Sequence, residues 1–270
     1  KLPPFFYLFR IILFFTILKS RLVKFFYQYP CENYIHVKTM YEEIIPNLYM
    51  LKTKKPSCNS YLILGDQKKI LIDSGINKHL KYLREDIKKI GLELDDLSMV
   101  INTHEHVDHF GANRQLQDRV PILTHRYAAT KIVSADDEVL RCRAHGENPT
   151  GYQVHVWLEN LNVVDMGDWF LKILHTPGHT SGSLCIYEPR KRVLISGDTV
   201  FAHGTISQIS TSGSYGEYIN SLARLNTMKI DLLLPGHGSI SVNVEEDIKK
   251  AINNANEKHA LFLKKEKFKE

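Results

Sequence analysis

A short run of histidines directly after an apolar segment most constrains what this chain can fold into. Residues 97–103 (LSMVINT) are apolar and rich in β-branched side chains, which predicts a short buried strand. Residues 103–109 (THEHVDH) follow at once and place four potential metal ligands where the chain leaves the sheet. His104 and His106 can share one metal, while the acid and the histidine after them turn toward a second. A cation held there would lower the pKa of bound water to about 7.

Three later segments repeat one pattern, in which an apolar strand and a tight turn end in a candidate ligand. A glycine beside each ligand lets the backbone approach closely. Open α/β sheets place their ligands at this edge of the sheet. Together with the first run, these segments give seven candidate ligands and predict a two-metal site. The three segments are 171–183 (LKILHTPGHTSGS), with His179, 191–199 (KRVLISGDT), with Asp198, and 232–238 (LLLPGHG), with His237.

These motifs resemble those of the metallo-β-lactamase superfamily, whose H-x-H-x-D-H signature and three downstream ligands occur here in the same order. The resemblance covers residues 41–240 and implies an α/β fold, a four-layer αβ/βα sandwich with the metals at one sheet edge. Asp73, in the run LIDSG, matches an early Asp of the family that orients ligands rather than binding metal. A turn-forming Asp before Gly is its alternative interpretation. The resemblance implies His104, His106 and His179 on one metal, Asp108, His109 and His237 on the other, and Asp198 bridging them.

The ligand cluster predicts a metal-dependent hydrolase. Two cations about 3.5–4 Å apart hold a bridging hydroxide that attacks an electrophilic carbonyl or phosphorus. One cation then stabilises the oxyanion that develops. Asp108 is the predicted catalytic residue, because it can orient the hydroxide and handle its proton. Two divalent metal ions are expected, with zinc first and iron or manganese as alternatives, since His/Asp sites accept all three.

The substrate class stays open at this point. The ligand spacing is most similar to the glyoxalase-II-like branch, which hydrolyses thioesters such as hydroxyacylglutathione, but the loop 203–210 lacks that branch's Arg and Asp. Lactonases are similar in their ligands, yet Phe201 replaces the Tyr that many of them carry. β-Lactamases use Cys or Ser in place of Asp198, which argues against antibiotic hydrolysis. Thioester, lactone and other ester substrates are therefore retained. The alternatives are a persulfide dioxygenase with one iron on His104, His179 and Asp198, and a phosphodiesterase or nuclease.

Composition and charge limit the kinds of partner that the protein is expected to bind. With 43% hydrophobic residues, the 270-residue chain can bury a large core. The net charge of +5 lies in residues 1–39, which hold six basic residues and one acidic, so the rest is neutral. A neutral body argues against a nucleic-acid partner. The resemblance implies a small-molecule acyl substrate, and the oligomeric state stays open. Four widely spaced cysteines without a C-x-x-C motif fit reduced thiols and a cytoplasmic location.

Residues 1–39 form a hydrophobic, basic N-terminal extension, and residues 40–270 are the predicted catalytic domain. The apolar run 5–18 is shorter than the roughly 20 residues that span a bilayer, and no signal-peptide cleavage site follows it. Three interpretations stay open: a gene-model artefact, a membrane-surface anchor with flanking basic residues, and a packed core helix. Membrane contact is expected only through this segment, and the protein is membrane-associated if the segment is native.

The remaining pattern alternates strands and helices. Residues 135–165 give no clear pattern and are expected to shape part of the substrate pocket. His145 and His155 within them lack partners in the sequence, so plain packing or exposure is expected of both. The expected elements are strands over 44–51, 60–64, 69–73 and 120–124, and helices over 78–90, 110–117, 126–134, 214–226 and 244–267.

Overall fold

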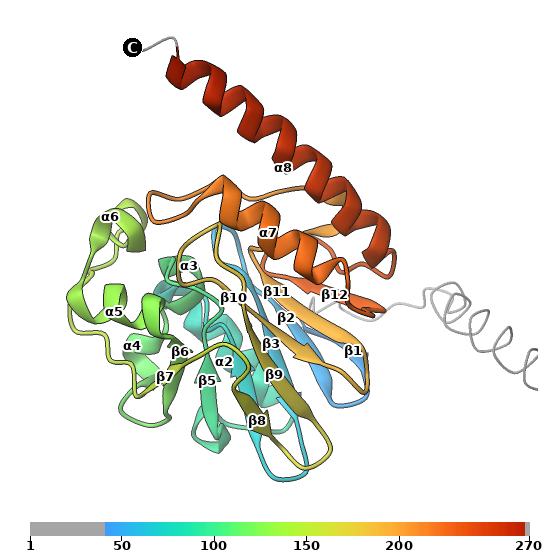
Figure 1. The fold of residues 1–270 in the computed structure, drawn as a ribbon. Coiled ribbons are helices and arrows are strands. Elements are labelled where there is room, and N and C mark those ends of the chain that lie inside the picture. The colour runs from blue at the N-terminus through green and yellow to red at the C-terminus, as the bar shows by residue number, and fades with distance from the viewer. Residues whose placement is uncertain (1–40, 268–270) are drawn as a thin grey trace, which may run out of the picture. The chain divides into compact units, whose positions relative to one another are not determined.

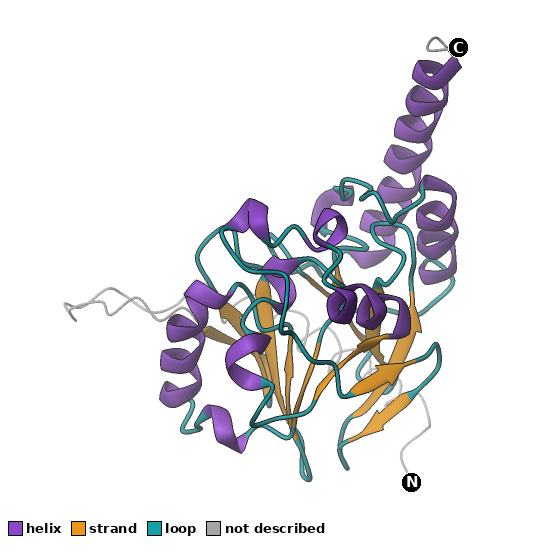
Figure 2. Ribbon diagram, turned by 90° about the vertical axis from the view of Figure 1, so that its left-hand side faces the viewer, coloured by secondary structure: helices purple, strands orange, loops and turns teal. Residues whose placement is uncertain are grey.

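The computed structural model describes residues 41–267, with side chains up to residue 265. The predicted N-terminal extension, residues 1–39, lies outside the described residues. Two mixed β-sheets face each other, and helices lie outside them, as Figure 1 and Figure 2 show. No helix among residues 41–267 is both long and apolar enough to cross a membrane.

The first sheet contains seven strands in chain order, antiparallel from β1 to β4 and parallel from β4 to β7. In the second sheet the order is β12-β11-β10-β9-β8, and only the β11–β12 pair is parallel. The strands are β1 Tyr41–Ile45, β2 Leu48–Lys52, β3 Asn59–Leu64, β4 Lys69–Ile72, β5 Met99–Ile101, β6 Ile122–His125, β7 Val156–Leu158, β8 Val163–Asp165, β9 Phe170–His175, β10 Leu184–Glu188, β11 Val193–Gly197 and β12 Leu232–Pro235.

Alternating side chains along the strands build the layers. On β4, Ile70 and Ile72 face the second sheet and join the central core, whereas Leu71 faces outward. Leu71 packs there with Leu83 and Ile87 of helix α2 (Leu80–Lys89). Because the side-chain period of a strand is two, this one strand serves both core layers. The outer face of the second sheet is covered in the same way by helices α7 (Tyr215–Leu225) and α8 (Val244–Lys267) (Figure 1). The predicted four-layer αβ/βα sandwich is confirmed.

Helices occupy the outer layers and the crossovers between parallel strands. The helices are α2 Leu80–Lys89, α3 Val107–Phe110, α4 Asn113–Leu116, α5 Arg126–Ser134, α6 Asp137–Leu140, α7 Tyr215–Leu225 and α8 Val244–Lys267, with 3₁₀ turns η1 Asn77–His79, η2 Leu94–Asp96, η3 Arg143–His145 and η4 Ala202–Gly204. The predicted helices over 126–134 and 244–267 agree with α5 and α8. Helix α2 stops before Gly91, whose φ of 92° suits a residue that ends a helix.

Two sequence predictions are wrong in a way that bears on the fold. The single strand over 44–51 is a hairpin, β1 and β2, because Pro46-Asn47 forms a turn in which Asn47 adopts a φ of 67°. The helix predicted over 110–117 begins instead at Val107 and breaks at Gly111 into α3 and α4. As a result, Asp108 and His109 lie on the first turn of a short helix rather than in an open loop.

Candidate metal centre

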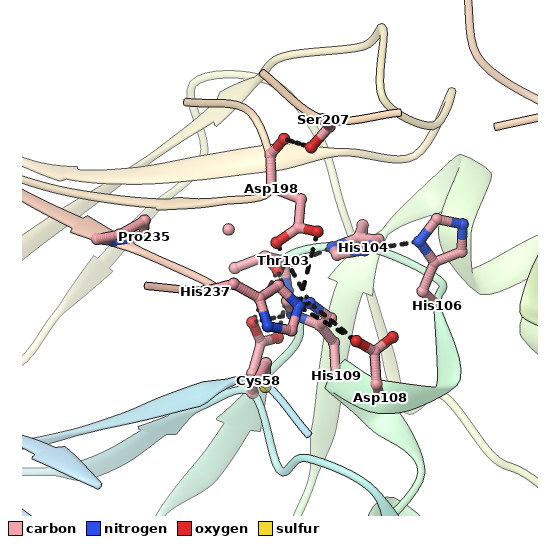
Figure 3. A network of polar contacts seen from close by, with 12 residues as sticks. Cys58, Thr103, His104, His106, Asp108, His109, Asp198, Ser207, Pro235 and His237 are labelled. Atoms are coloured by element: carbon pink, nitrogen blue, oxygen red, sulfur yellow. Dashed lines mark hydrogen bonds and ion pairs between the residues drawn. The ribbon is translucent and has the colours of Figure 1, made fainter. Parts of the chain in front are cut away.

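The seven predicted ligands meet at one edge of the sandwich. Four of them follow β5 of the first sheet, and the other three follow β9, β11 and β12 of the second. Figure 3 shows Asp198, His109, Asp108 and His237 gathered around one point, with His104 and His106 beside them. The two sheets therefore each supply ligands to the same site, as their strand ends predict.

Three imidazoles form the first group of potential ligands. His106 Nδ1 lies 3.1 Å from His104 Nε2 and 3.0 Å from His179 Nε2. All three side chains are buried. Because a nitrogen of each ring points at the same small volume, this group could hold a metal ion.

Asp108, His109 and His237 form a second such group. His237 Nε2 lies 3.2 Å from both His109 Nε2 and Asp108 Oδ2. Asp198 stands between the two groups: its Oδ1 is 3.4 Å from His109 Nε2, and its Oδ2 is 3.7 Å from both His179 Nε2 and His237 Nε2. A single carboxylate thus contacts ligands of both groups.

Hydrogen bonds on the far side of three rings set which nitrogen faces the site. His179 Nδ1 donates to the carbonyl oxygen of Gln208 at 2.7 Å. His109 Nδ1 donates to Asp73 Oδ2 at 2.8 Å, and His104 Nδ1 lies 3.1 Å from Thr103 Oγ1. The Nε2 atoms of His104 and His179 therefore present a lone pair toward the other ligands, and Nε2 of His109 faces them as well.

Asp73 belongs to neither of the two ligand groups, but its carboxylate hydrogen-bonds to Thr103 and His109. Its Oδ1 accepts the backbone N–H of Thr103 at 2.7 Å, and its Oδ2 accepts Thr103 Oγ1 at 2.8 Å in addition to His109 Nδ1. Since the Thr103 hydroxyl donates to Asp73, it is left to accept from His104. One buried carboxylate thereby fixes a ring in each group, through Thr103 in one case and directly in the other.

The turn that carries His237 is held by the first sheet. Asn59 donates its backbone N–H to the carbonyl of Gly236 at 2.7 Å, and the Tyr61 hydroxyl donates to the carbonyl of Pro235 at 2.7 Å. Gly236 is needed for close packing, because a Cβ there would lie 2.4 Å from Asp198 Oδ1. These contacts place the end of β12 against the end of β11.

Burial and mutual contact keep most of the donors deprotonated. Burial, reinforced by neighbouring imidazoles, lowers the pKa of His104 well below its ordinary value and that of His106 to about 3. Burial alone would raise the pKa of Asp108, but His109 and His237 outweigh it and bring it to about 2. The pKa of Asp198 is lowered for the same reason. Burial would lower the pKa of His109, but nearby acidic groups, Asp73 and Asp198 among them, raise it well above its ordinary value.

The donor set fits divalent cations. Nε2 of His104 and Nε2 of His179 both face Nδ1 of His106. Because the two Nε2 atoms carry no proton, Nδ1 of His106 is the only one of the three nitrogens that can donate a hydrogen bond within the group. Asp198 Oδ1 is buried and accepts no hydrogen bond from any residue among 41–267, although His109 Nε2 is 3.4 Å away. Such an arrangement is unfavourable without positive charge, because buried acceptors need a partner. Imidazole and carboxylate ligands of this kind suit zinc, iron or manganese.

Several residues contribute to the site although no sequence motif indicates them. Thr103 is the first residue of the run 103–109, and no role follows from that position. Glu105 lies between two predicted ligands, and its side chain is fully buried. Cys58, one of the four cysteines, is buried beside His109, and burial raises the pKa of its thiol to about 12. Among these residues only Glu105 has a signal in the sequence, because it is a charged residue inside the run of predicted ligands. His155 is exposed, one of the two outcomes expected of it, and its Nδ1 accepts the backbone N–H of Ile122.

Comparison with known proteins agrees with this geometry. The family model described as the metallo-beta-lactamase superfamily matches residues 54–237. A probable metallo-hydrolase of Methanocaldococcus jannaschii is 34% identical over 191 residues, covering 68% of this chain and 89% of that protein. An acyl-coenzyme A thioesterase of Bos taurus is 27% identical over 207 residues, covering 66% of this chain and 72% of that protein.

Solved structures show the same fold at lower sequence identity. A subclass B3 metallo-beta-lactamase of Bradyrhizobium japonicum superposes with a TM-score of 0.70 at 20% identity, over 86% of this chain and 96% of that chain. A metallo-beta-lactamase of Legionella gormanii gives a TM-score of 0.68 at 20% identity, over 88% and 99%. With the family match over residues 54–237, these findings show that the chain belongs to the metallo-beta-lactamase superfamily.

Proposed function

We propose that this protein is a dinuclear metal-dependent hydrolase that cleaves an acyl thioester. The observation that carries the proposal is the pair of ligand groups sharing Asp198, because a two-metal site is the arrangement suited to hydrolytic displacement. The similarity to acyl-coenzyme A thioesterases supports a thioester over a lactone or another ester. Glyoxalase-II-like and lactonase activities are finer alternatives within the same reaction class.

In this proposal each ligand group holds one divalent cation. His104, His106 and His179 would hold the first, Asp108, His109 and His237 would hold the second, and Asp198 lies between the two groups. Cations bound there supply Lewis-acid activation of a water and of the acyl carbonyl. Zinc is the proposed metal, with iron or manganese as alternatives, because the ligand types accept all three.

The chain's own residues handle the proton in the proposed reaction. Asp108 is ionised at neutral pH and its side chain is 18% exposed, so it can accept a hydrogen bond from an attacking water. The water oxygen forms a bond to the acyl carbon, the C–S bond breaks, and the proton from water passes through Asp108 to the leaving thiolate. Asp73 keeps His109 in the orientation that leaves Nε2 free.

Metal content and a substrate panel test the proposed function together. The full chain purified without chelator is expected to contain close to two divalent ions by elemental mass spectrometry. It is expected to hydrolyse acyl-coenzyme A or acyl-glutathione faster than lactones. Close to one iron, with oxygen uptake in the presence of a glutathione persulfide, would instead identify a persulfide dioxygenase. Cleavage of a phosphodiester but of no acyl substrate would also contradict the proposal.

Asp73→Asn is expected to lower metal affinity by about 10–100-fold, the usual cost of losing a group that orients a ligand. The amide nitrogen cannot accept from His109 Nδ1, so one ring loses the contact that fixes its tautomer. Isothermal titration calorimetry of the metal-free variant with zinc measures the change in metal affinity. Asp168→Asn serves as the control, because Asp168 also accepts a backbone N–H, at 2.9 Å from Asp66, but away from the site. Equal affinities in the two variants would contradict the role given to Asp73.

A further inference from the structure

Glu105 lies between two predicted metal ligands, and its side chain is fully buried. Its Oε1 is 3.2 Å from Lys131 Nζ on α5, and its Oε2 accepts the Thr180 hydroxyl at 2.8 Å. Gly182 leaves room for the carboxylate, since a Cβ there would lie 2.5 Å from Oε2. The carboxylate is therefore enclosed by polar partners rather than left in an apolar environment.

The contacts of this ion pair join the segments that carry the first ligand group. Lys131 Nζ donates to Ser181 Oγ at 2.6 Å and to the carbonyl of Tyr127 at 2.9 Å. Ser212 Oγ donates to Glu105 Oε1 at 3.5 Å. Thr180 and Ser181 directly follow His179, so Glu105 links the segment of His104 and His106 to the segment of His179.

The loop of Ser212 holds His179 from its other side. Besides the bond from the His179 ring to the Gln208 carbonyl, the backbone N–H of Ser210 donates to the carbonyl of His179 at 2.9 Å. Glu105 thus contacts three segments, those of Thr180, Lys131 and Ser212. Through them, and as the chain neighbour of His104, it lies beside both histidines that contact His106 in the first group.

Stability alone is a weak reason to bury Glu105 beside Lys131, whose side chain stays 18% exposed. The desolvation cost of two buried charges often exceeds their attraction, so an apolar pair of similar size would frequently serve stability as well. Ligands, by contrast, must be held within about 0.5 Å of their working positions by the groups around them. The location of the pair, with one member between two ligands of the site, favours this second role.

We propose that Glu105 and Lys131 are positioning residues that fix His106 and His179 as partners in the first ligand group. The inference rests on the proposed two-metal function. Neither residue touches substrate in this proposal. Glu105 acts through the backbone of its neighbouring histidines and through Thr180, and Lys131 completes the charge balance of the carboxylate.

Cobalt titration of the metal-free full chain tests the pair without relying on activity. Two Co²⁺ ions are expected to bind the wild-type protein, each with its own visible absorption. In Glu105→Gln, one of them is expected to bind about 10–100-fold more weakly, with the other unchanged, because only the first ligand group depends on this contact. The double variant Glu105→Gln/Lys131→Met, which leaves no unpaired buried charge, is expected to behave in the same way.

A matched control separates positioning from general loss of a buried ion pair. Glu188 is also buried, pairs with Arg190 at 3.2 Å, and accepts the backbone N–H of Lys191, but it lies at the end of β10 away from the ligands. Glu188→Gln is expected to bind both Co²⁺ ions like the wild type, even if its melting temperature falls.

The outcomes distinguish this inference from the proposed function. Wild-type affinity for both Co²⁺ ions in the Glu105 variants overturns the positioning role, even if the enzyme hydrolyses thioesters. Selective weakening of one ion in a protein that hydrolyses no thioester supports the positioning role and removes the proposed substrate. A wild-type chain that binds no Co²⁺ overturns both.

Discussion

Replacing Asp108 with asparagine is expected to reduce the kcat of thioester hydrolysis by about 10²–10⁴-fold, the usual contribution of a positioned proton acceptor. The amide keeps the size of the side chain but cannot take a proton from water. Asp108 combines contact with a ligand, 3.2 Å to His237 Nε2, with partial exposure to solvent. Its lowered pKa of about 2 keeps it ionised at neutral pH. Steady-state kinetics and elemental mass spectrometry on the same preparation measure the effect.

Metal content in the same variant separates the two roles proposed for Asp108. Two retained ions with a lowered kcat would support the proton role, whereas loss of one ion would show that ligation dominates. Asp231→Asn is the control, because Asp231 is an exposed partner of Arg192 and exposed ion pairs contribute little. Two bound ions together with wild-type kcat in Asp108→Asn would remove Asp108 from the mechanism.

Much of the fold could be predicted from the sequence because its strongest signals are local. Helix α5 has the predicted bounds, and α7 begins after Ser214, whose hydroxyl accepts the N–H of Glu217 as a helix cap. The pairing of strands was not predictable, because register depends on contacts between distant residues. Strand β10 was missed for a related reason: its five residues are all buried, so they show no alternation between apolar and polar positions.

The ligand set was easier to predict than the contacts that support it. Each ligand follows an apolar strand, and strand ends of one sheet meet at one edge, so His179, Asp198 and His237 could be placed together without coordinates. Supporting groups carry no such pattern. The carbonyl of Gln208 acts through the backbone, and Glu105 reaches its partners on α5 only because the chain folds back there. The spacing of motifs therefore predicts the candidate ligands. The residues that hydrogen-bond to these ligands can be identified only from contacts in the folded structure.

Gly236→Ala is expected to lower kcat by about 10² or more, although the change adds a single methyl group. The new Cβ would lie 2.4 Å from Asp198 Oδ1 and 2.7 Å from His109 Cε1, distances that force one of these side chains to move. Asp198 lies within 4 Å of His109 and His237 in one ligand group and of His179 in the other. A displacement of about 1 Å in such a group is enough to cost about 10²-fold in rate.

Two measurements identify the cause of the lower kcat: the metal content of Gly236→Ala, and the kcat of a control variant at a second glycine. Gly216→Ala in α7 is the matched control, because its Cβ would meet only Ser214 Oγ, at 3.8 Å, and alanine favours a helix more than glycine does. If displacement of Asp198 is the cause, Gly236→Ala should bind fewer than two ions and keep a cooperative unfolding transition. Full metal content with normal kcat in Gly236→Ala would mean that Asp198 can move without consequence, and its place between the two ligand groups would then have no part in the reaction.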